Sequence, residues 1–228
     1  MSKTGIYNLT QFTMLDYQGK LSCIIWFAGC NMQCQYCHNP QIVNSTGDYS
    51  LEKIKEFLKS RVGKLEAVVL SGGEATLYKG LPELAKFIKD LGFLVKLDTN
   101  GTNPKMVKKM IDDGLVDYIA LDYKATKEKF EFITDCKLWD KFQATLKILV
   151  DNQNNVPFEV RTTWHSELLS KNDIDEILSD LNSKNYKAKF YLQNCNKVEN
   201  EDPFVDLPAS SIIDKSILKN QKIHVEIR

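Results

Sequence analysis

The chain has 228 residues, and its 30 basic and 30 acidic side chains cancel to a formal charge of zero. A pI of about 6.8 leaves no global field that would attract nucleic acid or an anionic membrane. A hydrophobic content of 43% with only 11 Gly and 6 Pro indicates a globular fold and excludes disordered and collagenous classes. The longest apolar run, Cys23 to Ala28, is too short for a transmembrane helix, and the N-terminus lacks a secretory signal, so we expect a cytoplasmic protein without a membrane partner.

Short apolar runs alternate with segments of helical spacing along the whole chain. In chain order, the sequence predicts strands at 21–27, 67–70, 94–97, 118–121, 158–162, 188–192 and 223–227. Helices are expected at 51–60 behind Ser50, at 81–91 around Pro82, from Asn103-Pro104 to Gly114, and from a cap at Asn172 to about Leu181. Strand–helix alternation implies parallel strands with crossover helices, which is the α/β class. Because no linker or repeat interrupts the pattern, we expect one domain over 1–228.

Three of the six cysteines lie together in a loop behind the first predicted strand. Cys30, Cys34 and Cys37 have the spacing C-x3-C-x2-C, and without an export signal they are expected to be thiols rather than disulfides. Three thiolates can hold three irons of a cubane and leave the fourth iron open to a small molecule, whereas structural zinc needs four closed positions. Zinc remains the alternative, although His38 would have to fold back to serve as the fourth ligand.

Polar groups follow three neighbouring predicted strands, on the face where barrels build active sites. The glycines of Ser71-Gly72-Gly73-Glu74 allow backbone to approach a ligand, and the Glu74 carboxylate can accept from an ammonium group. Asp98 and Asp122 can flank a cation, and Lys124 can meet a carboxylate. The alternative for these residues is an ordinary role in turns and helix caps. Neither a dinucleotide-binding fingerprint nor a P-loop is present.

The stretch from Gly29 to Pro40 resembles the cluster loop of radical S-adenosylmethionine (radical SAM) enzymes, and more narrowly that of glycyl-radical-enzyme activases. It is most similar to the activating proteins of anaerobic ribonucleoside-triphosphate reductase, with pyruvate formate-lyase activase a step further away. Matching motifs run from Asp16 to Gln193. The resemblance implies a partial (β/α)6 TIM-like barrel with parallel strands, a [4Fe-4S] cluster on the three cysteines, and SAM that chelates the open iron.

The resemblance also implies roles for individual side chains. Gly72, Gly73 and Glu74 would hold the methionyl amine, and Arg161 would bind the cofactor carboxylate. Asp98, Thr99 and Asp122 would hold a monovalent cation beside that carboxylate. Tyr36 and His38 would bind the cofactor from the cluster loop, and Lys124 and Asp16 would face the reaction. The chain departs from the family at Gln193-Asn194, where one amide would replace a ribose contact. His165 is expected on a surface loop rather than in catalysis, Cys195 as a buried structural thiol, and Trp26 and Phe27 in the core.

The implied activity is that of an activase. An electron from the reduced cluster would cleave SAM, and the resulting 5′-deoxyadenosyl radical would remove hydrogen from a glycine of a partner, most closely an anaerobic ribonucleotide reductase. A flavodoxin- or ferredoxin-type protein would supply the electron. The chain is little longer than such a core, so we expect an open barrel without a second cluster domain. The alternatives are a radical SAM enzyme for a small molecule or RNA, against which zero net charge weighs, and an electron carrier or zinc module.

Overall fold

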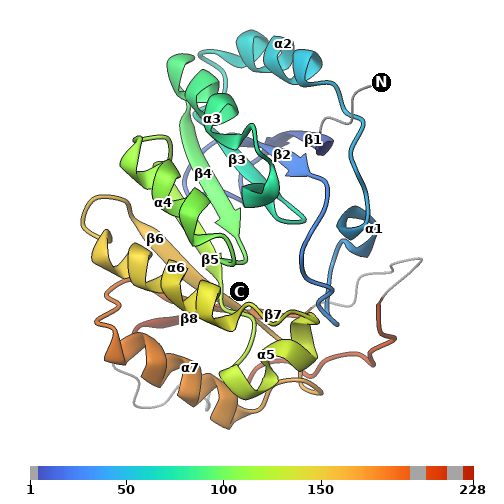
Figure 1. Cartoon of the computed structure of the whole chain (residues 1–228), viewed down its shortest axis with the longest axis vertical. Helices are drawn as coiled ribbons and strands as arrows, with labels where there is room; N and C mark the ends of the chain where they lie inside the picture. Colours follow the sequence, from blue (N-terminus) through green and yellow to red (C-terminus); the bar gives the residue numbers. More distant parts are fainter. Residues whose placement is uncertain (1–4, 196–203, 215–222) are drawn as a thin grey trace. The chain divides into compact units, whose positions relative to one another are not determined.

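A computed structural model describes residues 5–195, 204–214 and 223–228 (Figure 1). Strands and helices alternate along most of the chain, which confirms the α/β class. The elements are β1 (Ile6–Thr13), β2 (Ser22–Phe27), α1 (Pro40–Val43), α2 (Leu51–Arg61), β3 (Ala67–Gly72), a 3-10 turn η1 (Ala75–Leu77), α3 (Leu81–Asp90), β4 (Leu94–Thr99), α4 (Pro104–Asp112), β5 (Tyr118–Asp122), α5 (Lys127–Thr134), α6 (Trp139–Asp151), β6 (Phe158–Trp164), α7 (Lys171–Ser183), β7 (Phe190–Asn194) and β8 (Val225–Ile227).

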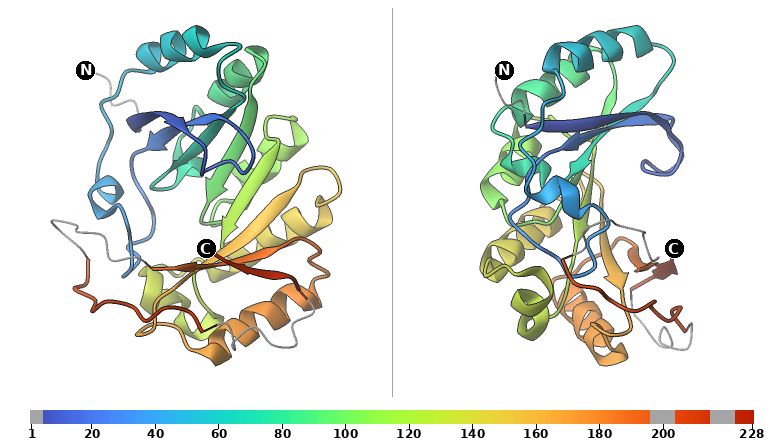
Figure 2. Two further views of the ribbon diagram at one scale, coloured as in Figure 1. Left: turned by 180° about the vertical axis from the view of Figure 1, so that it is seen from behind. Right: turned by 90° about the vertical axis from the view of Figure 1, so that its right-hand side faces the viewer.

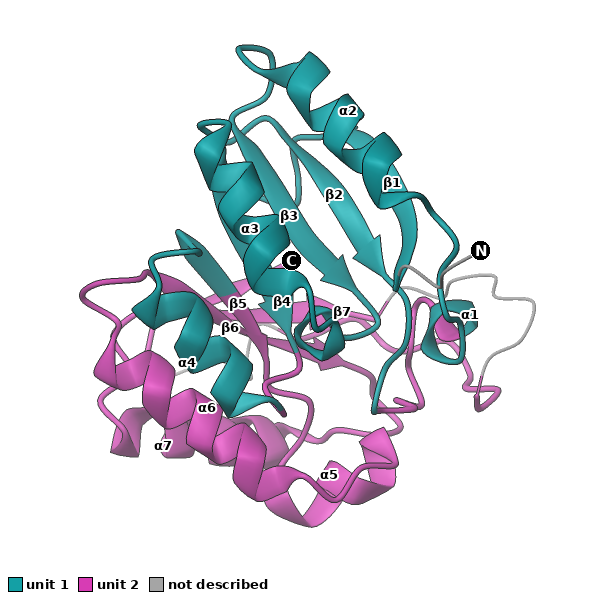
Figure 3. Cartoon of the chain, turned by 45° about the horizontal axis from the view of Figure 1, so that its top comes forward, with its two compact units in different colours: residues 1–31, 41–99, 103–119 teal, residues 32–40, 100–102, 120–228 magenta. Residues whose placement is uncertain are grey.

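The chain forms two compact units, which Figure 3 colours separately. Unit 1 comprises residues 1–31, 41–99 and 103–119, and unit 2 comprises residues 32–40, 100–102 and 120–228. The cysteine loop crosses this division, because Cys30 belongs to unit 1 whereas Cys34 and Cys37 belong to unit 2. The expectation of a single domain stays a prediction.

Unit 1 is built on three parallel strands, β2, β3 and β4, with fully buried side chains such as Ile25 and Leu70 in register with each other. The sequence did not predict β1, which pairs antiparallel with β2 (Figure 2). Its residues are mostly half-buried or exposed, so it lacks the continuous apolar run of the parallel strands. Trp26 is half-buried rather than in the core, and its indole N–H donates to the Thr10 hydroxyl at 2.8 Å.

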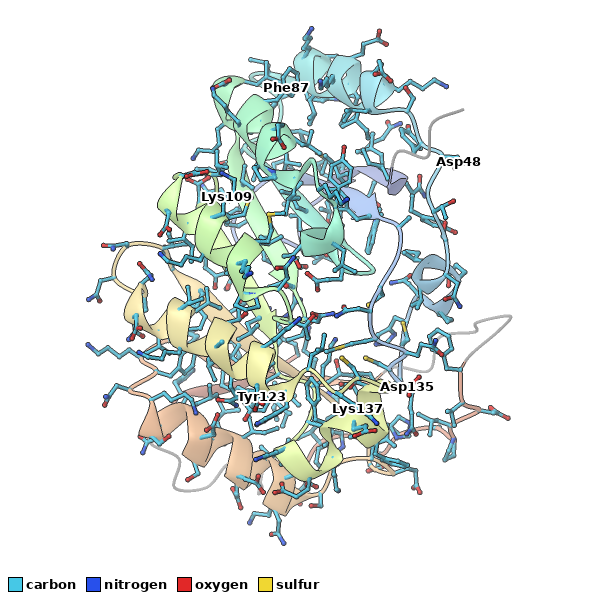
Figure 4. The ribbon with its side chains drawn as sticks, in the orientation of Figure 1. Asp48, Phe87, Lys109, Tyr123, Asp135 and Lys137 are labelled. Carbon is cyan, nitrogen blue, oxygen red and sulfur yellow. The ribbon has the colours of Figure 1, made fainter. Side chains whose placement is uncertain are left out.

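Unit 2 contains the parallel strands β6, β7 and β8 together with α5, α6 and α7. Helices α5 and α6 were not predicted from the sequence, although Phe142, Leu146 and Leu149 recur at helical spacing in α6 and are buried. Tyr123, labelled in Figure 4, packs edge-on against Phe142 with ring centroids 4.7 Å apart. Its hydroxyl donates to Asp180 of α7 at 3.0 Å, so an aromatic cluster joins the end of β5 to the helices of this unit.

The helix starts follow the predicted capping with one exception. Ser50 accepts from Lys53 N at the start of α2, and Asn103 accepts from Met106 N at the start of α4. The predicted cap of α7 at Asn172 is wrong, because Ser170 forms a reciprocal capping box with Asp173 and begins the helix earlier. In the described ranges, no helix combines the length and the apolar character that crossing a bilayer requires.

Candidate functional site

The turn after β3 packs against the beginning of the cysteine loop within unit 1. Gly73 N donates to Phe27 O, and Glu74 N donates to Gly29 O, both at 2.9 Å. A Cβ on Gly73 would lie 2.2 Å from the Gly29 carbonyl oxygen, and one on Gly72, whose φ is +128°, would lie 2.4 Å from Phe27 N. Both positions therefore require glycine, because another backbone segment of the chain approaches closely there. The predicted close approach to a ligand stays a prediction.

The Glu74 carboxylate is buried, with 2% of the residue exposed. Its Oε1 accepts from Thr76 N at 3.1 Å, from the Thr76 hydroxyl at 2.5 Å and from the Thr99 hydroxyl at 2.7 Å. Glu74 thus caps η1, which is the alternative role in a turn that the sequence allowed. It also accepts a hydrogen bond from Thr99. A carboxylate can also accept from an ammonium group, and this role of Glu74 stays a prediction.

Asp98 has a buried cationic neighbour that the sequence analysis overlooked. Lys96, which is 4% exposed in the middle of β4, places its Nζ 3.2 Å from Asp98 Oδ1 and donates to the backbone carbonyl of Asp16 at 2.5 Å. The Ser71 hydroxyl donates to the other Asp98 oxygen at 3.2 Å. A lysine inside the apolar run 94–97, two residues before an aspartate, was the available signal, because alternate strand residues share a face.

Asp122 in unit 2 lies between two cations. Arg161 Nε donates to Asp122 Oδ1 at 2.9 Å, and Lys124 Nζ donates to Oδ2 at 3.1 Å. Burial alone would raise the pKa of Asp122, but the charges of Arg161 and Lys124 and their hydrogen bonds outweigh it and hold this pKa at about 2. Burial would lower the pKa of Lys124, and the neighbouring Asp122 charge reverses this and raises it. The group carries one more positive than negative charge, which suits a carboxylate ligand.

Within unit 2, the cysteine loop is anchored to the end of α5. Gln33 N donates to Thr134 O at 2.9 Å and Gln35 N to Ile133 O at 3.0 Å. The buried Tyr36 donates its hydroxyl to the Lys124 carbonyl at 3.1 Å, which connects the loop to the Asp122 group. Burial raises the pKa of the Cys34 thiol to about 11 despite the opposing charge of Lys124.

The cysteines themselves differ in burial. Cys34 is 8% exposed, and Cys30 and Cys37 are half-buried. Over residues 5–195, 204–214 and 223–228, no three His, Cys, Asp or Glu side chains gather as they would around a single metal ion. Their roles as iron ligands remain a prediction.

The remaining predicted residues differ in whether their side chains form hydrogen bonds within the protein or are described by their exposure. The Asn194 side chain accepts from Ile213 N at 3.0 Å and donates to Arg228 O at 3.3 Å, so of the two amides Gln193, which is half-buried, is the better candidate for a ligand contact. Asp16 turns its carboxylate to the Thr13 hydroxyl at 2.6 Å. His38 is exposed, and Cys195 is half-buried rather than buried.

The expectation of His165 on the surface is wrong. His165 is 3% exposed, its Nδ1 accepts from Glu167 N at 3.3 Å, and its Nε2 lies 3.1 Å from the Pro208 carbonyl. Since Nδ1 accepts, the proton is assigned to Nε2, which donates to that carbonyl. His165 holds two loops together.

A cavity of about 510 Å³ in unit 2 is formed by α5, α6 and α7 and is lined by residues that include Tyr123, Trp139 and Asp180. It contains none of the predicted site residues. Alternation along the chain places Tyr123 on this helical side and its neighbours Asp122 and Lys124 on the other. The candidate site is therefore the set of polar groups at the strand ends, not this cavity.

Comparison with known proteins shows which families the chain resembles. A protein of Methanocaldococcus jannaschii, named as a candidate glycyl-radical enzyme activating enzyme, is 35% identical over 181 residues, covering 77% of this chain and 74% of its own length. A 7-carboxy-7-deazaguanine synthase of Archaeoglobus fulgidus is 30% identical over 190 residues, covering 78% of this chain and 76% of its own length.

The fold is shared with SuiB of Streptococcus suis, solved with S-adenosylmethionine bound, with a TM-score of 0.63 at 13% identity over 90% of this chain and 51% of that chain. The chain thus spans about half the length of this solved structure. This likeness confirms the expected barrel-type core at the level of the fold. The model of the radical SAM superfamily matches residues 24–181, from β2 to α7 and across all three clustered cysteines. The chain therefore belongs to the radical SAM superfamily, and it is an enzyme whose cofactors are a [4Fe-4S] cluster and S-adenosylmethionine.

Proposed function

We propose that this protein is a glycyl-radical-enzyme activase whose partner is an anaerobic ribonucleoside-triphosphate reductase. The observation that carries the proposal is the 35% identity to an enzyme named for glycyl-radical activation, extending over 77% of the chain. The proposal includes the cytoplasmic location expected from the sequence and the flavodoxin- or ferredoxin-type electron donor that the resemblance implied.

In this proposal Cys30, Cys34 and Cys37 hold the cluster, whose fourth iron stays open to SAM. When bound, the two cofactors supply a one-electron cleavage that leaves methionine, 5′-deoxyadenosine and a glycine radical on the partner. Thiol ligands must lose their protons on binding iron.

Polar groups within each unit match one functional group of SAM. Glu74, oriented by Thr76 and Thr99, accepts from the SAM amino group. The excess positive charge of Lys124 and Arg161 over Asp122 binds the SAM carboxylate. Because these side chains are held by their own hydrogen bonds, little reorganisation is needed when the ligand arrives.

A second candidate is a radical SAM enzyme for a small molecule. It is favoured by the 30% identity to a 7-carboxy-7-deazaguanine synthase over 78% of the chain. Both candidates use the same cofactor site and differ only in the molecule that donates hydrogen.

The two candidates are separated by the requirement for a partner. Reduced protein, SAM and an anaerobic ribonucleotide reductase, mixed without oxygen, should give an organic doublet radical by electron spin resonance and one 5′-deoxyadenosine per radical. If 5′-deoxyadenosine forms only after a nucleoside or another metabolite is added, the activase proposal fails and the second candidate replaces it.

The cluster assignment has its own test. Changing Cys30, Cys34 or Cys37 to Ala should each reduce iron and acid-labile sulfide after anaerobic reconstitution, because each removes a thiolate ligand. Cys23→Ala is the matched control, since Cys23 lies fully buried within β2 and outside the loop. A full cubane in any one of the three loop variants would remove that cysteine from the ligand set.

A further inference from the structure

We infer that this protein neutralises Asp98 with its own Lys96 and binds SAM without the monovalent cation that its resemblance to the activases implied. The inference concerns the SAM site alone and does not depend on which molecule donates hydrogen.

Lys96 is a buried cation between apolar residues of β4. It is 4% exposed, and its neighbours Val95 and Leu97 are fully buried. A buried ammonium group requires a charged or polar partner to offset its lost hydration. Lys96 finds both, in the Asp98 carboxylate at 3.2 Å and in the Asp16 carbonyl at 2.5 Å. The Asp16 carbonyl accepts a hydrogen bond from Lys96 Nζ and holds the ammonium group at this position.

Asp98 is one of the three residues expected to bind an inorganic cation at this site. Its Oδ2 accepts from the Ser71 hydroxyl, and its buried Oδ1 faces Lys96 at ion-pair distance without an aligned hydrogen bond. A sodium or potassium ion at Oδ1 would come close to the Lys96 ammonium charge and be repelled by it. The lysine therefore provides the positive charge that the cation would otherwise bring.

The other two expected cation ligands are also engaged by the protein. Thr99 donates its hydroxyl proton to Glu74 at 2.7 Å. Asp122 is paired with Arg161 at 2.8 Å and with Lys124 at 3.1 Å. Each of these partners belongs to the same unit as the residue it binds.

Within each unit the charges pair without an added ion. In unit 1, Lys96 offsets Asp98. In unit 2, Arg161 and Lys124 both pair with Asp122.

The test compares SAM affinity in different salts. Equilibrium dialysis of cluster-loaded protein with SAM is carried out in potassium, sodium or tetramethylammonium chloride at constant ionic strength, with no partner present. Wild-type affinity should be the same in all three salts. Lys96→Met keeps the length of the side chain and removes its charge, so its affinity in tetramethylammonium should fall by about ten- to a hundredfold and recover in potassium or sodium.

Lys89→Met is the matched control, because Lys89 also forms a close ion pair, with Asp117 at 2.5 Å, but near the opposite end of the strands. It should behave as wild type in every salt. If Lys96→Met fails to fold, the double variant Lys96→Met/Asp98→Asn removes both buried charges and should bind SAM equally in all three salts.

Two results would overturn the inference. One is wild-type affinity that collapses in tetramethylammonium and returns with potassium or sodium, which would mean that an inorganic cation is required. The other is a folded Lys96→Met that binds SAM like wild type in all salts. Because binding is measured without a partner, neither result bears on the activase proposal, which fails only in the radical assay.

Discussion

At the scale of single residues, Glu74 illustrates how one buried carboxylate serves both the fold and a ligand. Three protein donors converge on its Oε1, and they come from Thr76 and Thr99. A neutral amide with the same shape would still accept these bonds, but it would lose the charge that attracts an ammonium group. The two roles can therefore be separated by a conservative substitution.

Glu74→Gln should lower SAM affinity of the cluster-loaded protein by about ten- to a hundredfold, the cost of roughly 1.5 to 3 kcal/mol for one charged hydrogen bond. Its melting temperature should stay near that of wild type, because the cap of η1 is retained. Titration of SAM together with thermal unfolding checks both parts. Affinity equal to wild type in a normally folded variant would show that Glu74 serves only the fold.

Asp122 makes the free energy of unfolding depend on pH in the acid range. Its pKa is about 2 in the folded protein, below the usual 3.8, so the folded state binds fewer protons than the unfolded state over this range. The stability from Asp122 is therefore complete above about pH 4 and is lost as the pH falls through about 2. In cluster-free protein, urea unfolding should show a wild-type advantage over Asp122→Asn of up to about 2 kcal/mol near neutral pH. That advantage should shrink steadily below about pH 4; a difference independent of pH would mean that the ion pairs with Arg161 and Lys124 add no stability.

At the scale of elements, the start of α7 is controlled by Ser170 rather than by the residue the sequence suggested. Ser170 accepts from Asp173 N at 3.3 Å, and the Asp173 carboxylate accepts from Ser170 N at 2.6 Å. The Asp173 carboxylate also accepts a hydrogen bond from Lys129 Nζ of α5 at 2.8 Å, so the capping box joins two helices of unit 2.

Ser170→Ala should reduce the free energy of unfolding by about 1 kcal/mol, because it leaves backbone donors at the helix start unsatisfied. Asn172→Ala is the matched control, since Asn172 is an exposed residue inside the helix and its change should cost little. Urea denaturation of both variants decides the point. Equal losses would restore Asn172 as a capping residue.

At the scale of the whole molecule, 30 basic and 30 acidic side chains leave no net charge. Proteins that bind RNA through its phosphates need a local excess of Lys and Arg, and their affinity rises steeply as salt is removed. Here many lysines are instead paired with carboxylates on neighbouring helical turns, such as Lys108 with Asp112 at 2.7 Å.

We therefore expect no binding of single-stranded or transfer RNA at about 0.15 M salt. Fluorescence anisotropy of labelled RNA, titrated with the cluster-loaded protein, measures the dissociation constant. A micromolar or tighter dissociation constant that weakens with added salt would contradict this expectation and would favour RNA as the substrate.

Much of the architecture was predictable because it depends on local patterns. The apolar runs within β2, β3 and β5 are continuous, which is the composition expected of strands buried on both faces. Ser50 and Asn103 cap their helices through bonds to residues only three positions away. The edge strand β1 was not predicted, because it is held by its partner strand and has no apolar pattern of its own. The aromatic helices α5 and α6 were not predicted either.

By itself, the sequence determined the superfamily, the α/β class and the candidate ligands, because C-x3-C-x2-C, Gly72-Gly73-Glu74 and the strand-end aspartates each carry their chemistry in short contiguous stretches. Only the tertiary structure decided which charges neutralise one another. Asp122 meets Arg161 from 39 positions away, and Lys96 reaches the carbonyl of Asp16 from 80 positions away. Such pairings form only when the folded sheet brings distant residues together, and no local spacing in the chain encodes them.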